Sequence, residues 1–323
     1  MTRISCNDKY EVCLTDEADG VNLFSDKVFI EHQISVQNKK ALTFSLITTA
    51  DKKVLITQTF AHDVTSSEWL APITGAFGAM EASEYVTLDE IEFFVSSLTT
   101  YLCNSEGAES IQWRLPPLYY KNKVHTKLQN VLYRFGWKIK EFDLNFHLPV
   151  TNYELFRSNL SSSKRRELNR ITKTNTEFGE AVTDEQRREV YDIIKLNRES
   201  QGYPMTMPWE AIAKLATAIG QKIRFYSLKR EQDLLAGAIC LVLDSDNLYV
   251  FYWGENPEFR KDSTIVKLAE GIYLNALEAG FSTLDIGTST NHSEPNQGLI
   301  NFKENIGCQV TQKLTLIFDK DEK

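Results

Sequence analysis

The segment LYVFYWGENPEFRKDSTI, residues 248–265, carries the strongest structural signal in the chain. Residues 248–253 are aromatic, aliphatic or β-branched, which favours a buried strand, and the polar run from Gly254 to Pro257 ends it. A helix is expected over residues 265–279, because apolar residues recur there at about 3.6-residue spacing and Gly280 follows at the C-cap position. A second strand is expected over residues 281–286. The segment therefore predicts a strand, a loop, a helix and another strand.

The loop before this helix predicts an anion site. The first turn of a helix has unpaired N–H groups and the positive end of the helix dipole, which suit a pyrophosphate. Ser263 and Thr264 lie where an N-cap belongs, and Arg260 and Lys261 add cationic donors just before it. The alternative is that the two basic residues are ordinary solvated loop charges.

Several short motifs of the second half occur in a recognisable order. They are SSKRREL at 162–168, NR at 197–198 with GYP at 202–204, LAGA at 235–238, LDIG at 284–287 and GLINFK at 298–303. Their order resembles the Gcn5-related N-acyltransferase (GNAT) fold, and more closely its FemAB-like branch. That branch includes the peptidoglycan bridge-forming aminoacyl transferases and related acetyltransferases.

The resemblance implies a donor site in the second half, built from Tyr252, Trp253 and Gly254 together with Arg260, Lys261, Ser263 and Thr264. Backbone N–H groups near Gly254, where such strands splay apart, would polarise the donor carbonyl. Two departures bear on this expectation. The glycines of the usual pyrophosphate loop are missing, since Ser263 and Ile265 occupy their positions, and Phe302 stands where many members have a tyrosine that protonates the leaving thiolate.

Two residues are predicted to be catalytic. Asp285 lies late in a central strand and would accept the proton of the attacking amine, although it could instead cap the following loop. Lys303 would stabilise developing negative charge or hold an anionic ligand, although a surface salt bridge with Glu304 would give the same sequence. The residues predicted to bind the acceptor substrate are Arg166, Arg198, Tyr203, Asn291 and Phe302.

The two halves of the chain resemble each other. A helix over 88–102, a strand over 111–115, a helix ending near Trp137 and a strand over 138–148 have counterparts in the second half, which ends with a strand over 309–318. We therefore predict an α/β (α+β) fold of two tandem GNAT-like domains, 1–150 and 151–323. Each would have a mixed, mostly antiparallel central sheet flanked by helices.

Length and composition agree with two domains and limit the functions. The chain has 323 residues and 42% hydrophobic content, enough for two cores. A net charge of −8 argues against a general DNA-binding surface, and no stretch is long and apolar enough to span a bilayer. No secretory signal is evident at the start, so we expect a cytoplasmic protein. Five scattered cysteines and five histidines show no metal-ligand spacing, so no metal is expected.

The sequence thus predicts an N-acyltransferase that moves an acetyl or other acyl group from acyl-CoA to an amine of a sugar, peptide or cell-envelope precursor. An aminoacyl-tRNA-dependent FemAB-type transferase is the first alternative, because the pyrophosphate-loop glycines are missing. A non-catalytic binding protein that keeps the twin fold is the second. The acceptor and the oligomeric state do not follow from the sequence.

Overall fold

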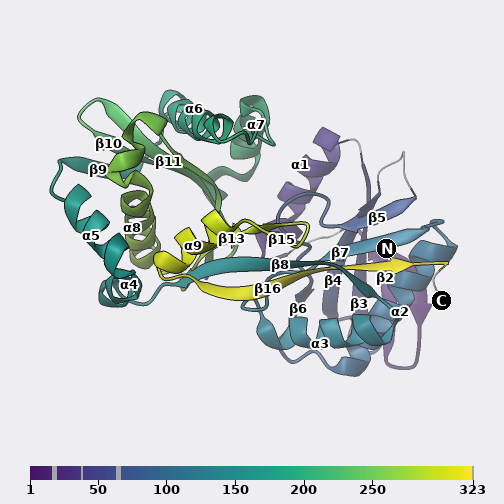
Figure 1. Ribbon diagram of the computed structural model, residues 1–323. Helices are drawn as coiled ribbons and strands as arrows, with labels where there is room; N and C mark the ends of the chain where they lie inside the picture. Colours follow the sequence, from purple (N-terminus) through teal and green to yellow (C-terminus); the bar gives the residue numbers. More distant parts are fainter. Residues whose placement is uncertain (17–19, 38, 63–66, 322–323) are drawn as a thin grey trace. The chain divides into compact units, whose positions relative to one another are not determined.

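The computed structural model describes residues 1–16, 20–37, 39–62 and 67–321 (Figure 1). The chain forms two compact units. Unit 1 comprises Met1–Leu144, Thr290–Glu294 and Thr311–Lys323, and unit 2 comprises Asn145–Ser289 and Pro295–Val310. The first crossing lies close to the predicted boundary at residue 150. A single cut there does not describe the units, because the chain also returns to unit 1 twice after residue 289.

Unit 1 is built on a mixed sheet. Its strands follow one another in the order β1 (Thr2–Cys6), β2 (Tyr10–Thr15), β3 (Lys40–Thr48), β4 (Val54–His62), β5 (Glu68–Ala71), β7 (Ser110–Arg114) and β16 (Gln309–Asp319). The short strand β6 (Glu81–Ala82) pairs with β4. Only β5 and β7 are parallel among the described pairs of this unit.

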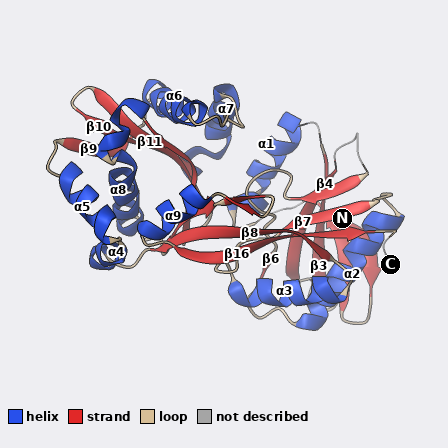
Figure 2. Ribbon diagram, viewed as in Figure 1, coloured by secondary structure: helices blue, strands red, loops and turns tan. Residues whose placement is uncertain are grey.

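Helices cover both faces of the unit 1 sheet. Helices α2 (Leu88–Asn104) and α3 (Asn122–Arg134) bury apolar residues in the main core, as the 3.6-residue spacing of Ile91, Phe94, Leu98 and Leu102 predicts. Helix α1 (Lys27–Gln37), preceded by the short 3-10 helix η1 (Leu23–Ser25), covers the other face through Ile30. Figure 2 shows these helices beside the strands of the unit.

Unit 2 is also built on mixed strand pairing. Its strand order is β8 (Lys138–Pro149), β13 (Thr283–Thr288), β12 (Asn247–Glu255), β11 (Asp233–Val242), β10 (Ile223–Arg230) and β9 (Thr176–Glu180). Strands β12 and β13 are parallel, and the other described pairs are antiparallel. Strand β12 extends the predicted strand by one residue before it and two after it.

Helices also cover both faces of the unit 2 sheet. Helices α4 (Tyr153–Asn159), α5 (Ser162–Ile171) and α8 (Thr264–Glu278) contribute to the core on one face. Helix α6 (Asp184–Ser200) packs on β11 and β12 over the other face, followed by α7 (Trp209–Ile219) and the turn η2 (Gly220–Lys222). The remaining elements are η3 (Pro257–Asp262), α9 (Gln297–Asn305) and the small ladder of β14 (Thr290–Asn291) with β15 (Glu294–Pro295).

The two units have the same order of elements around their parallel strands. Unit 1 has β5–α2–β7 followed by α3, and unit 2 has β12–α8–β13 followed by α9. The predicted repetition and the predicted class of fold are confirmed. One feature was not predicted. The final strand β16, from the second half of the chain, pairs with β7 in unit 1. The end of β8, the last strand of the first half, pairs with β13 in unit 2.

Candidate functional site

The candidate site lies where strands β12 and β13 separate. They pair only over three residues, from Asn247 opposite Thr283 to Tyr249 opposite Asp285. Strand β12 continues to Glu255 while β13 continues to Thr288, but their ladder does not. A bulge at Phe251 interrupts the pairing of β12 with β11, and bulges bend a strand and increase its twist. The predicted splaying of these strands is therefore present.

Glu255, the last residue of β12, reaches the first turn of α8. Its Oε2 accepts a hydrogen bond of 2.5 Å from the hydroxyl of Thr264, and its carboxylate also accepts from the backbone N–H of Ile265. Ser263 occupies the N-cap position in a left-handed conformation, with φ of 64°, and its side chain makes no capping bond. Ser263 therefore has the predicted N-cap position, but the side chain that accepts hydrogen bonds from the first turn is a carboxylate of the preceding strand.

Some surroundings of Glu255 destabilise its charged carboxylate and others stabilise it. Its side chain is 14% exposed, and burial raises the pKa of its carboxyl. The Thr264 hydroxyl, the positive charges of Arg260 and Lys164, and the Ile265 N–H lower the pKa by less than burial raises it. Glu255 is therefore a partly desolvated carboxylate held at a helix N-terminus, a position that favours an anion.

The two predicted loop cations have different surroundings. Arg260 is exposed, with its Nε 3.5 Å from Glu255 Oε1 and an N–H donating to the Ser200 hydroxyl at 3.2 Å. Lys261 has an exposed side chain, and its backbone carbonyl accepts a hydrogen bond of 3.1 Å from Arg170. The same Arg170 guanidinium donates to Ser263 Oγ at 3.1 Å. Helix α5 is thereby tied to the loop before α8.

Asp285 and Lys303 lie inside unit 2. Asp285 is 1% exposed, and its Oδ1 accepts hydrogen bonds from Asn145 Nδ2 at 2.8 Å and from the Gly287 N–H at 2.7 Å. Lys303 is 3% exposed, and its ammonium donates to the carbonyls of Gly287 and Thr288, both at 2.9 Å. The surface salt bridge considered for Lys303 is therefore excluded. Together the two side chains hold the end of β13, where Gly287 has a positive φ of 72°.

Aromatic side chains occupy the α8 side of the opening. The rings of Trp253 and Phe302 meet edge to face, with centroids 5.9 Å apart. The ammonium of Lys164, on α5, lies 5.6 Å from the centre of the Phe302 ring. The structure thus brings together two residues that were predicted separately, one for the donor and one for the acceptor.

A second group lies on the α6 side. Tyr252 is buried, with its hydroxyl hydrogen-bonded to Thr206, and the guanidinium of Arg198 lies 5.7 Å from the centre of its ring. Arg198 also donates to the carbonyl of Pro204 at 3.2 Å, and Tyr203 is 53% exposed. Gly254 is needed here, because a Cβ on it would lie 3.0 Å from atoms of Ile194 and Asn197. The predicted residues Arg198, Tyr203, Tyr252 and Gly254 therefore come together around the end of α6.

Two predicted substrate residues lie apart from these groups. Arg166 is exposed on α5, on the outer surface of that helix. Asn291 is exposed in β14, which belongs to unit 1. Neither has a described contact with the residues around Trp253 or Tyr252, and their substrate roles stay predictions.

Sequence reasoning missed three residues of this region. Glu255, Asn145 and Thr206 contact predicted site residues from positions distant along the chain or outside the quoted motifs. Glu255 lies two residues after the strand predicted over 248–253, which placed it near the site, but nothing in the sequence marked its carboxylate as the cap of the helix.

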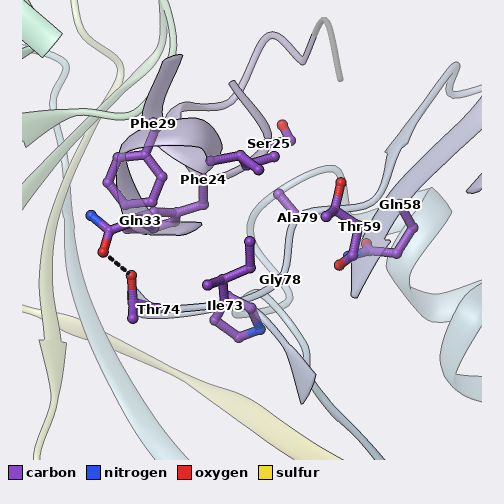
Figure 3. Close-up of a pocket in the computed structure, with 12 residues that line it drawn as sticks. Phe24, Ser25, Phe29, Gln33, Gln58, Thr59, Ile73, Thr74, Gly78 and Ala79 are labelled. Carbon is purple, nitrogen blue, oxygen red and sulfur yellow. Dashed lines mark hydrogen bonds between the residues drawn. The ribbon is translucent and has the colours of Figure 1, made fainter. Parts of the chain in front are cut away.

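Unit 1 contains a separate small pocket beside the loop that follows β5. Its lining includes Gln33, Gln58, Thr59, Ile73 and Thr74, and Figure 3 shows Gln33 and Thr74 facing each other across a hydrogen bond of 2.6 Å. The cavity has a volume of about 10 Å³, which is room for one water molecule. In this conformation it does not accept a substrate.

Two properties of the described residues bear on the class of site. No helix within them is long and apolar enough to cross a membrane. They also contain no group of three or more His, Cys, Asp or Glu side chains placed to hold a metal ion.

Similar proteins are found by structure and not by sequence. No family model matches the sequence, and no curated protein matches it either. The crystal structure of FemX superposes with a TM-score of 0.70 at 13% identity, over 92% of each chain. The structure of L-PGS from Bacillus licheniformis has a TM-score of 0.55 at 12% identity, over 95% of each chain.

A third solved structure is a tandem GNAT protein from the clavulanic acid biosynthesis pathway, crystallised without AcCoA. It superposes with a TM-score of 0.54 at 9% identity, over 96% of this chain and 98% of that one. At such identities the likeness concerns the fold alone. The fold is therefore the tandem GNAT fold, in the form found in FemX, as the motifs of the second half predicted.

Proposed function

We propose that this protein is an acyltransferase, which moves an acetyl, other acyl or aminoacyl group from an activated donor to an amine of a sugar, peptide or cell-envelope precursor. One observation supports this more than any other. The parallel strands β12 and β13 part after Tyr249, and β12 then leads through η3 to the N-terminus of α8, in a chain with a tandem GNAT fold. Such an opening can receive the acyl group of a donor between two strands.

The proposed reaction needs a neutral amine and a polarised carbonyl. The amine nitrogen attacks the carbonyl carbon, a C–N bond forms, and the C–S or C–O bond to the donor breaks. A primary alkyl ammonium has a pKa of about 10, so a base or water must take its proton, and the leaving group receives one. Backbone N–H groups near Gly254 would stabilise the developing oxyanion.

We assign Asp285 and Lys303 to positioning in this reaction. Their described contacts hold Gly287 and Thr288 at the end of β13, and both side chains are buried. A direct role of Asp285 in proton transfer stays a prediction. Trp253 and Phe302 would exclude water from one side of the opening, while Arg198 and Tyr203 would meet the acceptor on the other.

Acyl-CoA and aminoacyl-tRNA are the two donor classes under this proposal. Both are made in the cytoplasm, so the proposal places the reaction there. The test is incubation of the purified protein with labelled acetyl-CoA and, separately, with labelled aminoacyl-tRNA in the presence of amine acceptors. Transfer of label to an amine from either donor supports the proposal, and each donor is also expected to raise the melting temperature if it binds the native state.

A matched pair of glycine substitutions tests the place of the site by crowding β12 beside the opening rather than by removing charge. Gly254→Leu would press a side chain against Ile194 and Asn197 of α6, displace the end of β12 and abolish transfer, whereas Gly179→Ala, in β9 with no atom within 4 Å of its Cβ position, should retain transfer in the folded protein. If neither donor is bound or turned over, the chain is a binding protein that keeps the fold, and the acyltransferase proposal is wrong.

A further inference from the structure

The N-terminus of α8 already holds an anion that belongs to the chain itself. Glu255 accepts from the Thr264 hydroxyl and the Ile265 N–H, which are the donors that the first turn would offer to a ligand. Thr264 is fully buried, so its hydroxyl is not available from another direction. The capping contact joins Glu255 to Thr264, nine positions later in the sequence, so helix formation alone does not produce it.

A diphosphate arriving at this point would face two costs. It would have to displace Glu255 from the N–H and hydroxyl donors, and the displaced carboxylate would remain close to it. Like charges at such distances repel by more than they would in bulk water, because the surroundings are partly desolvated.

The nearby cations do not offset these costs. Arg260, the residue predicted to bind the donor diphosphate, has its Nε 3.5 Å from Glu255 and also donates to Ser200. Asp262, two positions further on, pairs with Arg230 at 3.0 Å. Of the two described basic residues of this loop, Lys261 has an exposed side chain with no described ion pair, and the exposed Glu258 adds a negative charge.

We propose that Glu255 is the residue that selects the donor: its carboxylate fills the anion position at the start of α8 and so rejects donors, such as coenzyme A thioesters, that need this position for a diphosphate. The inference rests on the proposed function and deepens it. The accepted donor is an activated acyl group whose carrier places no diphosphate there, which an aminoacyl ester of a ribose satisfies.

The test measures binding and needs no turnover. Titration calorimetry of the full chain with coenzyme A compares the wild type with Glu255→Ala and Glu255→Gln. Both variants are expected to bind at least tenfold more tightly than the wild type, Ala more than Gln, because the amide of Gln can still accept from Ile265. Pantetheine, which has no diphosphate, is expected to show no gain.

Glu258→Gln is the matched control. Glu258 is exposed in the same loop, and its loss changes the net charge equally without freeing the helix N-terminus. The near-isosteric Glu255→Gln keeps the test decisive if Glu255→Ala does not fold. The inference is overturned if the wild type binds coenzyme A as tightly as the Glu255 variants, if pantetheine gains equally, or if Glu258→Gln gives the same increase.

Failure of this inference can be told apart from failure of the proposed function. Transfer from acetyl-CoA by the wild type at the rate of Glu255→Gln leaves the acyltransferase standing and removes the role of Glu255. Tighter coenzyme A binding by both Glu255 variants, with no transfer from either donor, keeps the role of Glu255 and removes the acyltransferase.

Discussion

Helices α2 and α8 connect the parallel strands of their respective units, yet their N-termini are capped differently. The cap of α2 is formed by residues next to the helix in sequence. Thr87 Oγ1 accepts a hydrogen bond from the Glu90 N–H, and Glu90 Oε2 accepts one of 2.7 Å from the Thr87 N–H. The cap of α8 comes from farther along the chain, because the Ser263 side chain makes no capping bond and Glu255, which does, belongs to the preceding strand.

The difference is that α2 has a cap that no ligand can replace with a gain, whereas the group that caps α8 could be replaced by another anion. The cap of α2 forms with the helix itself, so a ligand gains nothing there. The carboxylate on α8 is held by a hydroxyl and an N–H that a different anion could also use, and burial works against its charge. Four predictions test how far the two units differ, from the largest effect on stability to the smallest.

Replacement of Lys303 by Met should cost unit 2 about 4 kcal/mol, since two carbonyls that its ammonium now satisfies lose their donor and each costs ~1–3 kcal/mol. The measurement is the urea midpoint. Glu304→Gln, exposed on the same helix, is the control and should leave the midpoint unchanged. A loss no greater than that of the control would mean that Lys303 is not buried as described.

Unit 1 should instead be sensitive to acid through His125 on α3. Burial, and secondarily the charge of Lys121, lowers the pKa of His125 from 6.5 to about 4. The neutral ring is therefore favoured by folding, and this stability is present above pH ~6.5 and lost as the pH falls towards 4, by about 3 kcal/mol. Urea midpoints at pH 7 and pH 4 should fall less for His125→Leu than for the wild type. Equal falls would contradict the burial of this ring.

The caps themselves can be compared by one matched pair of substitutions. Thr87→Ala should destabilise the protein by about 1 kcal/mol, as losses of N-cap side chains do, while Ser263→Ala should cost less than about half of that, because it loses no capping bond and only an exposed hydrogen bond from Arg170. Thermal denaturation of both variants gives the ratio. A larger loss for Ser263→Ala would show that α8 is capped locally after all.

The smallest effect is the pH dependence of Glu255. Because burial raises the pKa of its carboxyl above the unfolded value, its contribution to stability is present below that unfolded value and is lost as the pH rises through the folded one. The groups facing it are Thr264, Arg260 and Lys164. Glu255→Gln should therefore gain stability relative to the wild type between acid and neutral pH, as measured by denaturation at both. A relative loss would reverse the sign that we assign.

Local signals in the sequence were sufficient for the elements around the site. The aromatic strand before Gly254 and the helix after Ser263 agree with β12 and α8 to within about two residues, and the helix predicted over 88–102 begins where α2 begins. These features depend on periodicity and on caps that lie within a few residues. The meeting of Trp253 with Phe302 depends on packing across the sheet, which no such signal carries.

Two features escaped prediction for the same physical reason. Glu255 acts on a helix that begins nine positions later, and nothing in the intervening residues marks its carboxylate as the cap. Likewise, the alternating pattern of residues 309–319 specifies a strand but not its neighbour, because the pattern is the same in either sheet. Pairing partners are fixed by tertiary contacts.

The pairing of β16 with a strand of unit 1 has a consequence for biosynthesis. The sheet of unit 1 lacks β16 until residue 319 has been made, although β7, the strand that pairs with β16, is complete at residue 114, which is 205 residues earlier in the chain. The nascent chain must therefore carry β7 with an unpaired edge during most of its synthesis, a state that exposes a template for association with other chains. Unit 1 is therefore completed only when β16 has been made, and a chain truncated before β16 would lack a strand in the unit that was made first.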